Sequence, residues 1–103
     1  MNLKLSPGAL RVRINQTDVS LLCQRSTLIF DSGLSFLFKL ILVDLTSEDL
    51  TLSFEQNIPI LSVSRALFLK LLERLPSKKG IETTYQDFNG NPYKLSLEVD
   101  VRS

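Results

Sequence analysis

The sequence contains no histidine and a single cysteine, Cys23. Histidine is the commonest general base and a frequent metal ligand, so its absence removes the usual route to acid–base catalysis. One cysteine forms neither an internal disulfide nor a multi-thiolate zinc site, and no histidine is present to activate it as a nucleophile. The four glycines stand apart, which excludes a glycine-rich phosphate loop. We therefore expect no cofactor, no metal and no enzyme activity.

The chain also lacks an excess of either charge and a long apolar run. Twelve basic and eleven acidic residues give a net charge of +1, so nucleic acid is not an expected partner. The most apolar run, 34–43, is interrupted by Lys39 and is shorter than the roughly 20 residues of a membrane span. The N-terminal residues lack the apolar core of a signal peptide. These features, with the lone cysteine, favour a cytoplasmic protein.

The length and composition of the chain indicate an ordinary globular protein. The chain has 103 residues, of which 44% are hydrophobic and 22% charged, which is enough for a single domain over residues 1–103.

The first half of the sequence predicts a strand, a helix and a hairpin. Apolar and polar residues alternate over 9–14, as in a half-buried strand. Asn15 is suited to cap a helix over about 16–24, with Cys23 on its buried apolar face. The hairpin joins 27–30 to 34–43, whose apolar residues lie on both faces, which predicts a strand at the centre of the sheet.

The second half predicts two hairpins around a longer helix. Residues 50–62 form either one hairpin, turning at 56–57, or one bent strand, and Pro59 favours an edge position or a strand start. A helix then begins at Ser62 or Ser64 and ends before Pro76. The last hairpin joins 82–88 to 93–101 through an Asn-Gly turn.

Together these elements predict an α+β fold, with a mainly antiparallel sheet of about six or seven strands and two helices in the order β-α-β-β-β-β-α-β-β. A strand–helix–hairpin unit is a possible duplication, because 14–22 and 61–69 show a similar pattern. The same similarity arises wherever a strand leads into a capped helix, so both interpretations stay open.

The segment LRVRINQTDV at 10–19, followed by a hairpin and by LTLSFEQNIPILSVSRAL at 50–67, resembles a family of small uncharacterised bacterial proteins. Members of this domain family begin with an R-x-R-[IL] strand and a helix that opens with T-x-[ST]-[ED]-V. Val63 stands where the family has proline, and the family's tryptophan is missing here. The resemblance implies a compact bacterial α+β domain and brings no site residues.

Arg11 and Arg13 share one face of the first strand, and two interpretations are open. They either form a ladder of exposed ion pairs with Glu98 and Asp100 on a neighbouring strand, which we favour, or bind an anion together with Lys39. Lys94 and Arg102 would complete that second, basic face.

Other polar groups allow weaker alternatives. The pairs Glu98/Asp100 and Glu48/Asp49 are expected to be solvated rather than to hold a cation, since a calcium or magnesium site needs more converging oxygens. Tyr85 and Tyr93 flank the last hairpin and are expected to pack across its strands rather than to stack on a ligand.

The sequence favours a non-catalytic protein-interaction module that associates with itself as a homodimer. Five apolar residues lie off the principal apolar faces and would form the contact: Leu37, Ile41, Val43, Phe68 and Leu69. The alternative is a nucleic-acid or anion-binding domain that uses Arg11, Arg13 and Lys39. The candidate partner-binding residues are therefore Arg11, Arg13, Leu37, Lys39 and Ile41.

Overall fold

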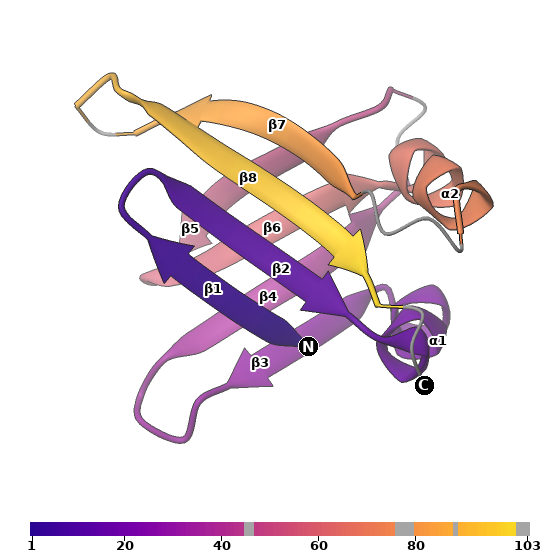
Figure 1. The fold of residues 1–103 in the computed structure, drawn as a ribbon. Coiled ribbons are helices and arrows are strands. Elements are labelled where there is room, and N and C mark those ends of the chain that lie inside the picture. Colours follow the sequence, from indigo (N-terminus) through magenta and orange to yellow (C-terminus); the bar gives the residue numbers. More distant parts are fainter. Residues whose placement is uncertain (45–46, 76–79, 88, 101–103) are drawn as a thin grey trace.

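A computed structural model describes residues 1–44, 47–75, 80–87 and 89–100 of the chain. Within these residues the fold is α+β, and the element order strand–strand–helix–strand–strand occurs twice (Figure 1). The strands are β1 (Asn2–Ser6), β2 (Ala9–Ile14), β3 (Thr27–Asp31), β4 (Leu37–Val43), β5 (Leu50–Glu55), β6 (Ile58–Ser64), β7 (Ile81–Gln86) and β8 (Pro92–Val99). The helices are α1 (Gln16–Arg25) and α2 (Arg65–Glu73).

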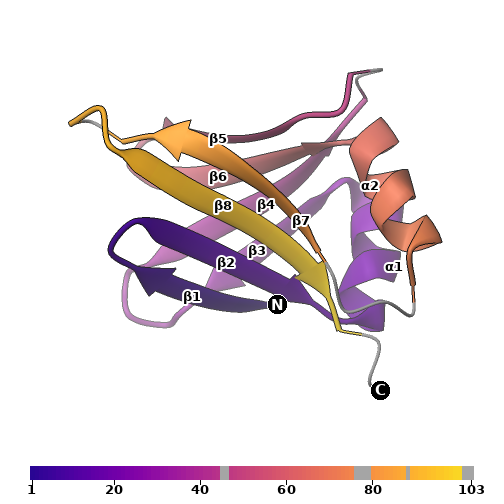
Figure 2. The same cartoon turned by 45° about the horizontal axis from the view of Figure 1, so that its top comes forward.

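The strands form two sheets that face one another (Figures 1 and 2). Sheet A has the order β1-β2-β8-β7, and sheet B has the order β3-β4-β6-β5. In each sheet the central pair is parallel and the outer pairs are antiparallel. The predicted α+β fold with two helices is confirmed, whereas the predicted mainly antiparallel sheet of six or seven strands fits only roughly. The described residues form eight strands in two sheets, and two of the six strand pairings are parallel.

Two details of the strand prediction are resolved by the structure. Residues 50–62 form a hairpin, because Gln56 and Asn57 both have positive φ, as the tight turn between two adjacent strands requires. Pro59 lies near the start of β6, which is an interior strand of sheet B. The strand that the sequence placed centrally, β4, is also interior, between β3 and β6.

The two halves of the chain have matching topology. β1 to β4 of the first half correspond to β5 to β8 of the second. When each strand is exchanged for its counterpart, the order of sheet A, β1-β2-β8-β7, becomes β5-β6-β4-β3, which is the order of sheet B read from its other edge. The N-caps Asn15 and Ser64 occupy the same place in the two halves. The predicted alignment of 14–22 with 61–69 instead sets Asn15 against Ser62, so that alignment is displaced by two residues. The repeated unit also contains one more strand than was predicted.

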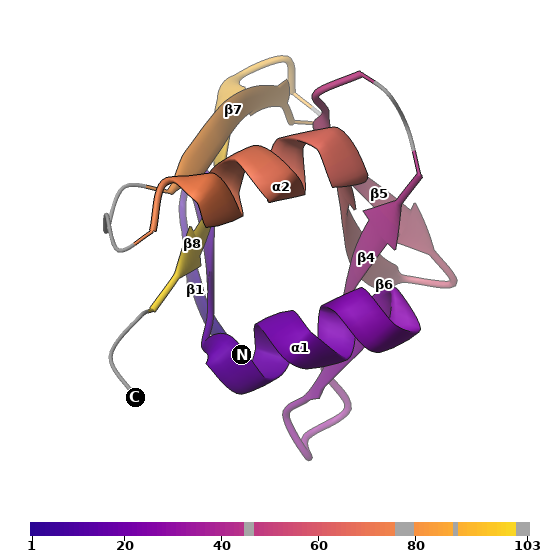
Figure 3. The same cartoon turned by 90° about the vertical axis from the view of Figure 1, so that its right-hand side faces the viewer.

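The two helices close one end of the space between the sheets, and the hairpin turns lie at the other end (Figures 2 and 3). Asn15 begins α1 with a capping box, in which its side chain accepts from Asp18 N–H and its own N–H donates to the Asp18 carboxylate. α1 follows β2 of sheet A and α2 follows β6 of sheet B, so the two helices begin at opposite sheets but at the same end of the molecule (Figure 3).

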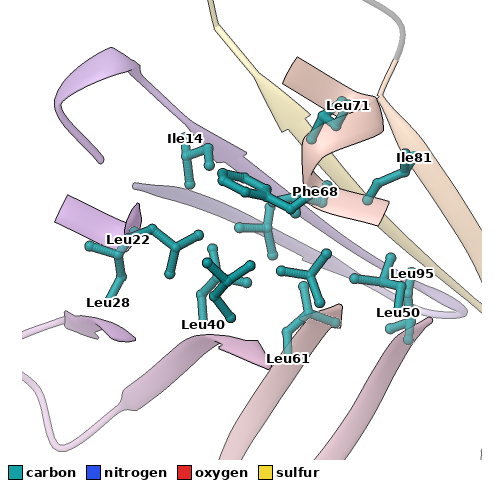
Figure 4. Packing of buried hydrophobic residues seen from close by; sticks show 14 of the residues in the cluster. Ile14, Leu22, Leu28, Leu40, Leu50, Leu61, Phe68, Leu71, Ile81 and Leu95 are labelled. Atoms are coloured by element: carbon teal, nitrogen blue, oxygen red, sulfur yellow. The ribbon is translucent and has the colours of Figure 1, made fainter. Parts of the chain in front are cut away.

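The core lies between the inner faces of the sheets and is closed by side chains from the helices (Figure 4). Leu22 of α1 and Phe68 and Leu71 of α2 are buried there. Phe68 is thus part of the core and not of an association surface, which corrects the sequence interpretation. Cys23 is exposed, although a buried position was expected, because only the stripe of α1 that contains Leu22 contacts the core.

Ser64 holds two parts of the fold together. Its buried hydroxyl oxygen accepts hydrogen bonds from Leu67 N–H, 3.3 Å away in the first turn of α2, and from Asp49 N–H, 3.0 Å away before β5. Its own backbone N–H donates to the Asp49 carbonyl at 2.9 Å. One hydroxyl therefore begins a helix and fixes the loop that leads into an edge strand.

Substituting Ser64→Ala is expected to lower the free energy of unfolding by about 2–3 kcal/mol, because it removes a helix cap and leaves two backbone N–H groups without their acceptor. Ser62→Ala, in the same strand, is the matched control and should change it by less than about 1 kcal/mol. Urea denaturation followed by circular dichroism measures both. Equal losses in the two variants would contradict the role assigned to Ser64.

Candidate functional site

The outer face of sheet A is polar and contains both candidate arginines. Because side chains alternate along a strand, the strand register assigns its members. They are Asn2, Lys4, Ser6, Ala9, Arg11, Arg13, Glu82, Thr84, Gln86, Pro92, Lys94, Ser96 and Glu98. An alanine and a proline are the only apolar residues among them.

Arg11 and Arg13 both bind Glu98, on the neighbouring parallel strand β8. The Arg11 Nε lies 3.4 Å from Glu98 Oε1, and the Arg13 Nη2 lies 3.3 Å from Glu98 Oε2. The ion-paired arrangement expected from the sequence is therefore present, with one carboxylate serving both guanidinium groups. Asp100 follows the end of β8, and its backbone N–H donates to the carbonyl of Ile14. Partly exposed pairs of this kind contribute about 0.2–1 kcal/mol each.

The outer face of sheet B carries aliphatic side chains among its polar ones. Its apolar members are Ile29, Leu37, Ile41, Val43, Ile58 and Ile60, of which Ile60 is buried. Its polar members are Thr27, Asp31, Lys39, Thr51, Ser53, Glu55 and Ser62, whereas Ser64 at the end of β6 is buried. Ile29 is 61% exposed, while Leu37 and Ile41 are partly exposed. We call this set of residues the aliphatic face.

The basic face predicted from Arg11, Arg13 and Lys39 does not form. The arginines lie on the outer face of sheet A, whereas Lys39 lies on the outer face of sheet B, on the opposite side of the molecule. Lys94 does share the face of the arginines, where it pairs with Glu82 at 3.4 Å. Arg102 lies outside the described residues. The error has a physical cause, since a single sheet would have brought these strands together and two sheets separate them.

Of the candidate partner-binding residues, Leu37, Lys39 and Ile41 are brought together. They alternate with the buried residues of β4 and project from the same side of sheet B. Leu69, which is exposed, lies on α2 at the end of the molecule and is not part of the aliphatic face. A strand that is apolar on both faces predicted this surface, because one face fills the core and the other is left uncovered in a single chain.

A concavity of about 680 Å³ runs along the edge strands β5 and β7. Four carboxylates line it, and each already has a partner within the chain: Glu48 with Lys70, Asp49 with Ser47, Glu82 with Lys94, and Glu98 with the two arginines. No group of three or more potential metal ligands occurs among the described residues. The four carboxylates of this concavity are therefore all engaged in ion pairs or hydrogen bonds within the chain.

The two tyrosines are direct cross-strand partners in the β7–β8 hairpin, as the sequence predicted. The Tyr93 hydroxyl donates to the Ala9 carbonyl at 3.1 Å. Both rings line a second cavity, of about 260 Å³, at the hairpin end of the molecule. No pattern in the sequence indicated this cavity, because its walls come from seven strands of both sheets.

No protein-family model matches the sequence, and neither a curated protein nor a solved structure shows significant similarity to it. No helix in the part of the chain that the structure describes is long and apolar enough to cross a membrane.

Proposed function

We propose that the protein is a non-catalytic interaction module that forms a homodimer through the aliphatic face of sheet B. The observation that supports this proposal is the contrast between the two outer faces. The outer face of sheet A is covered by polar and charged side chains, whereas the equivalent face of sheet B carries six aliphatic ones. Partly exposed aliphatic side chains that gather on one face of a small domain are typical of an interaction site.

The dimensions of the aliphatic face fit a weak dimer. Four strands of about six residues, at about 4.8 Å spacing, cover roughly 400 Å² of sheet surface. This lies within the size range of functional patches and at the low end for protein interfaces. We therefore expect a dimer with a dissociation constant in the micromolar range.

The charges on the aliphatic face suit a second copy of the chain. Lys39 lies near its centre, while Asp31 and Glu55 lie on the two edge strands. None of the three forms an ion pair with another described residue. In a two-fold symmetric dimer, the lysine of each copy would face an acidic residue on an edge strand of the other copy. The same surface is then complementary to itself. The net charge of +1 opposes association only weakly.

Light scattering across a dilution series tests the dimer. The wild-type protein should give twice the chain mass of 11.6 kDa at high concentration and approach that mass on dilution. Leu37→Glu should give only the monomer, with an unchanged circular dichroism spectrum, because it places an uncompensated charge in the contact. We expect the dissociation constant to rise by about 100-fold or more.

Thr84→Glu is the control, since it introduces the same charge at an exposed position of the opposite outer face. This variant should dimerise as the wild type does. The proposal is wrong if the wild-type protein stays monomeric at the highest concentration, or if both variants dissociate equally.

We further infer that the chain arose by duplication of a strand–strand–helix–strand–strand unit. The matched strand orders of the two sheets support this inference, as do the equivalent N-caps Asn15 and Ser64. Each unit then contributes one hairpin to each sheet, as two identical chains would in a symmetric pair.

A further inference from the structure

The cavity of about 260 Å³ lies between the two sheets at the hairpin end, opposite the helices. Five aromatic side chains line it: Phe36, Phe38, Phe54, Tyr85 and Tyr93. The remaining lining residues are leucines and a proline, together with Asp87 after the end of β7, and almost none of the cavity's surface is polar. The cavity is thus an apolar space whose surface is unusually rich in aromatic rings.

Exposed apolar side chains gather at this cavity rather than being scattered. Six large apolar residues are exposed among the described residues, and three of them line the cavity: Leu5, Phe54 and Tyr85. They belong to β1, β5 and β7, which come from both sheets. Isolated exposed apolar residues need no explanation, but a cluster around a concave opening is typical of a binding site.

The aromatic rings of the cavity and the one charged residue beside them favour a cation over an anion. The Asp87 Oδ1 accepts hydrogen bonds from the backbone N–H groups of Asn89 and Asn91, both at 2.9 Å, so the turn holds this carboxylate in place. Among the described residues that line the cavity, Asp87 is the only charged one. An ammonium group is attracted both to the carboxylate and to the faces of aromatic rings.

The volume limits the size of the ligand. An apolar cavity of about 150 Å³ accommodates benzene, so a cavity of 260 Å³ has room for about ten non-hydrogen atoms. A single aromatic ring with a short side chain has that size, whereas a nucleotide or a full-length fatty acid is too large.

We propose that this cavity binds a small aromatic ammonium compound, with the ring between the two sheets and the ammonium group beside Asp87. The site shares no residue with the aliphatic face. It therefore does not depend on the proposed dimer, and the failure of either proposal leaves the other standing.

The sequence provides a direct signal for binding. The chain has no tryptophan and two tyrosines, Tyr85 and Tyr93, and both line the cavity. Titration with 2-phenylethylammonium, which hardly absorbs where tyrosine is excited, should give a saturable change in tyrosine fluorescence. We expect a dissociation constant of roughly 10–500 μM for a ligand of this size. The neutral analogue 2-phenylethanol should bind several times more weakly, and the anion 3-phenylpropanoate more weakly still.

Three variants separate the contributions to binding. Asp87→Asn keeps an oxygen acceptor for the turn but removes the charge. It should lower the affinity for the ammonium compound by about three- to tenfold and leave the affinity for 2-phenylethanol unchanged. Phe54→Ala should lower the affinity for both ligands by about tenfold. Leu69→Ala is the matched control, since Leu69 is 51% exposed and Phe54 52%, and it should change neither affinity.

Two results would overturn the proposal. One is the absence of any saturable fluorescence change, together with unshifted NMR signals of the residues that line the cavity. The other is binding of 3-phenylpropanoate as tightly as the ammonium compound, which would show that Asp87 does not select the charge of the ligand.

Discussion

Cutting the chain after residue 46 is expected to give two fragments, 1–46 and 47–103, that are each unfolded alone and that fold together when mixed. The reason is the distribution of hairpins. The first fragment contains β1 and β2 of sheet A and β3 and β4 of sheet B, and the second fragment contains the other two strands of each sheet. Each fragment alone therefore has two isolated hairpins, which are marginal in water.

Amide NMR spectra of the separate and mixed fragments measure this effect. The equimolar mixture should recover the dispersed spectrum of the intact chain. Leu97→Glu in the second fragment should prevent recovery, because Leu97 is fully buried on β8. Thr84→Glu in the same fragment should permit it, since that side chain is exposed. A dispersed spectrum from either fragment as a monomer would show that pairing between the halves is not required.

Substituting Phe68→Ala is expected to lower the free energy of unfolding by about 3–5 kcal/mol. Phe68 is 1% exposed and projects from α2 into the space between the sheets, near Ile14 and Leu71 (Figure 4). Removing the ring leaves a cavity where the helices close the core. A loss of this size is a large part of the roughly 5–15 kcal/mol that stabilises a domain, so the melting temperature should fall by at least about 12 °C.

The adjacent residue is the control for this prediction. Leu69 is 51% exposed, and Leu69→Ala should change the free energy of unfolding by no more than about 0.5 kcal/mol. Urea denaturation followed by tyrosine fluorescence and by circular dichroism measures both variants. Similar losses for the two substitutions would mean that α2 does not pack as described.

Local features of the fold were predictable because they depend on neighbours in the sequence. The alternation of 9–14 indicated β2, and Asn15 correctly marked the start of α1. The strand β1 was missed, although Leu3 and Leu5 alternate with polar residues and Pro7-Gly8 follows as a turn. A five-residue strand carries too few alternating positions to stand out from a coil segment.

The two-sheet arrangement was not predictable, because it depends on pairs of strands far apart in the sequence. The charges predicted that Arg13 pairs with Glu98, but nothing near either residue indicates that β2 and β8 pair in parallel. The same limit explains which candidate binding residues were predicted from the sequence and which were missed. Leu37 and Ile41 were found because one strand carries both, whereas the aromatic cavity was missed because its walls meet only in the folded chain.

The strand order has a consequence for how the protein folds during synthesis. Sheet B is formed by the continuous segment 27–64, whereas sheet A joins residues 2–14 to residues 81–99. On the ribosome, sheet B can therefore assemble before β7 and β8 have been synthesised. Until then β1 and β2 lack their sheet partners, and their apolar sides stay uncovered. Since pairing of such distant segments is slow, the nascent chain passes through a stage in which apolar surface of β1 and β2 is exposed and prone to aggregation.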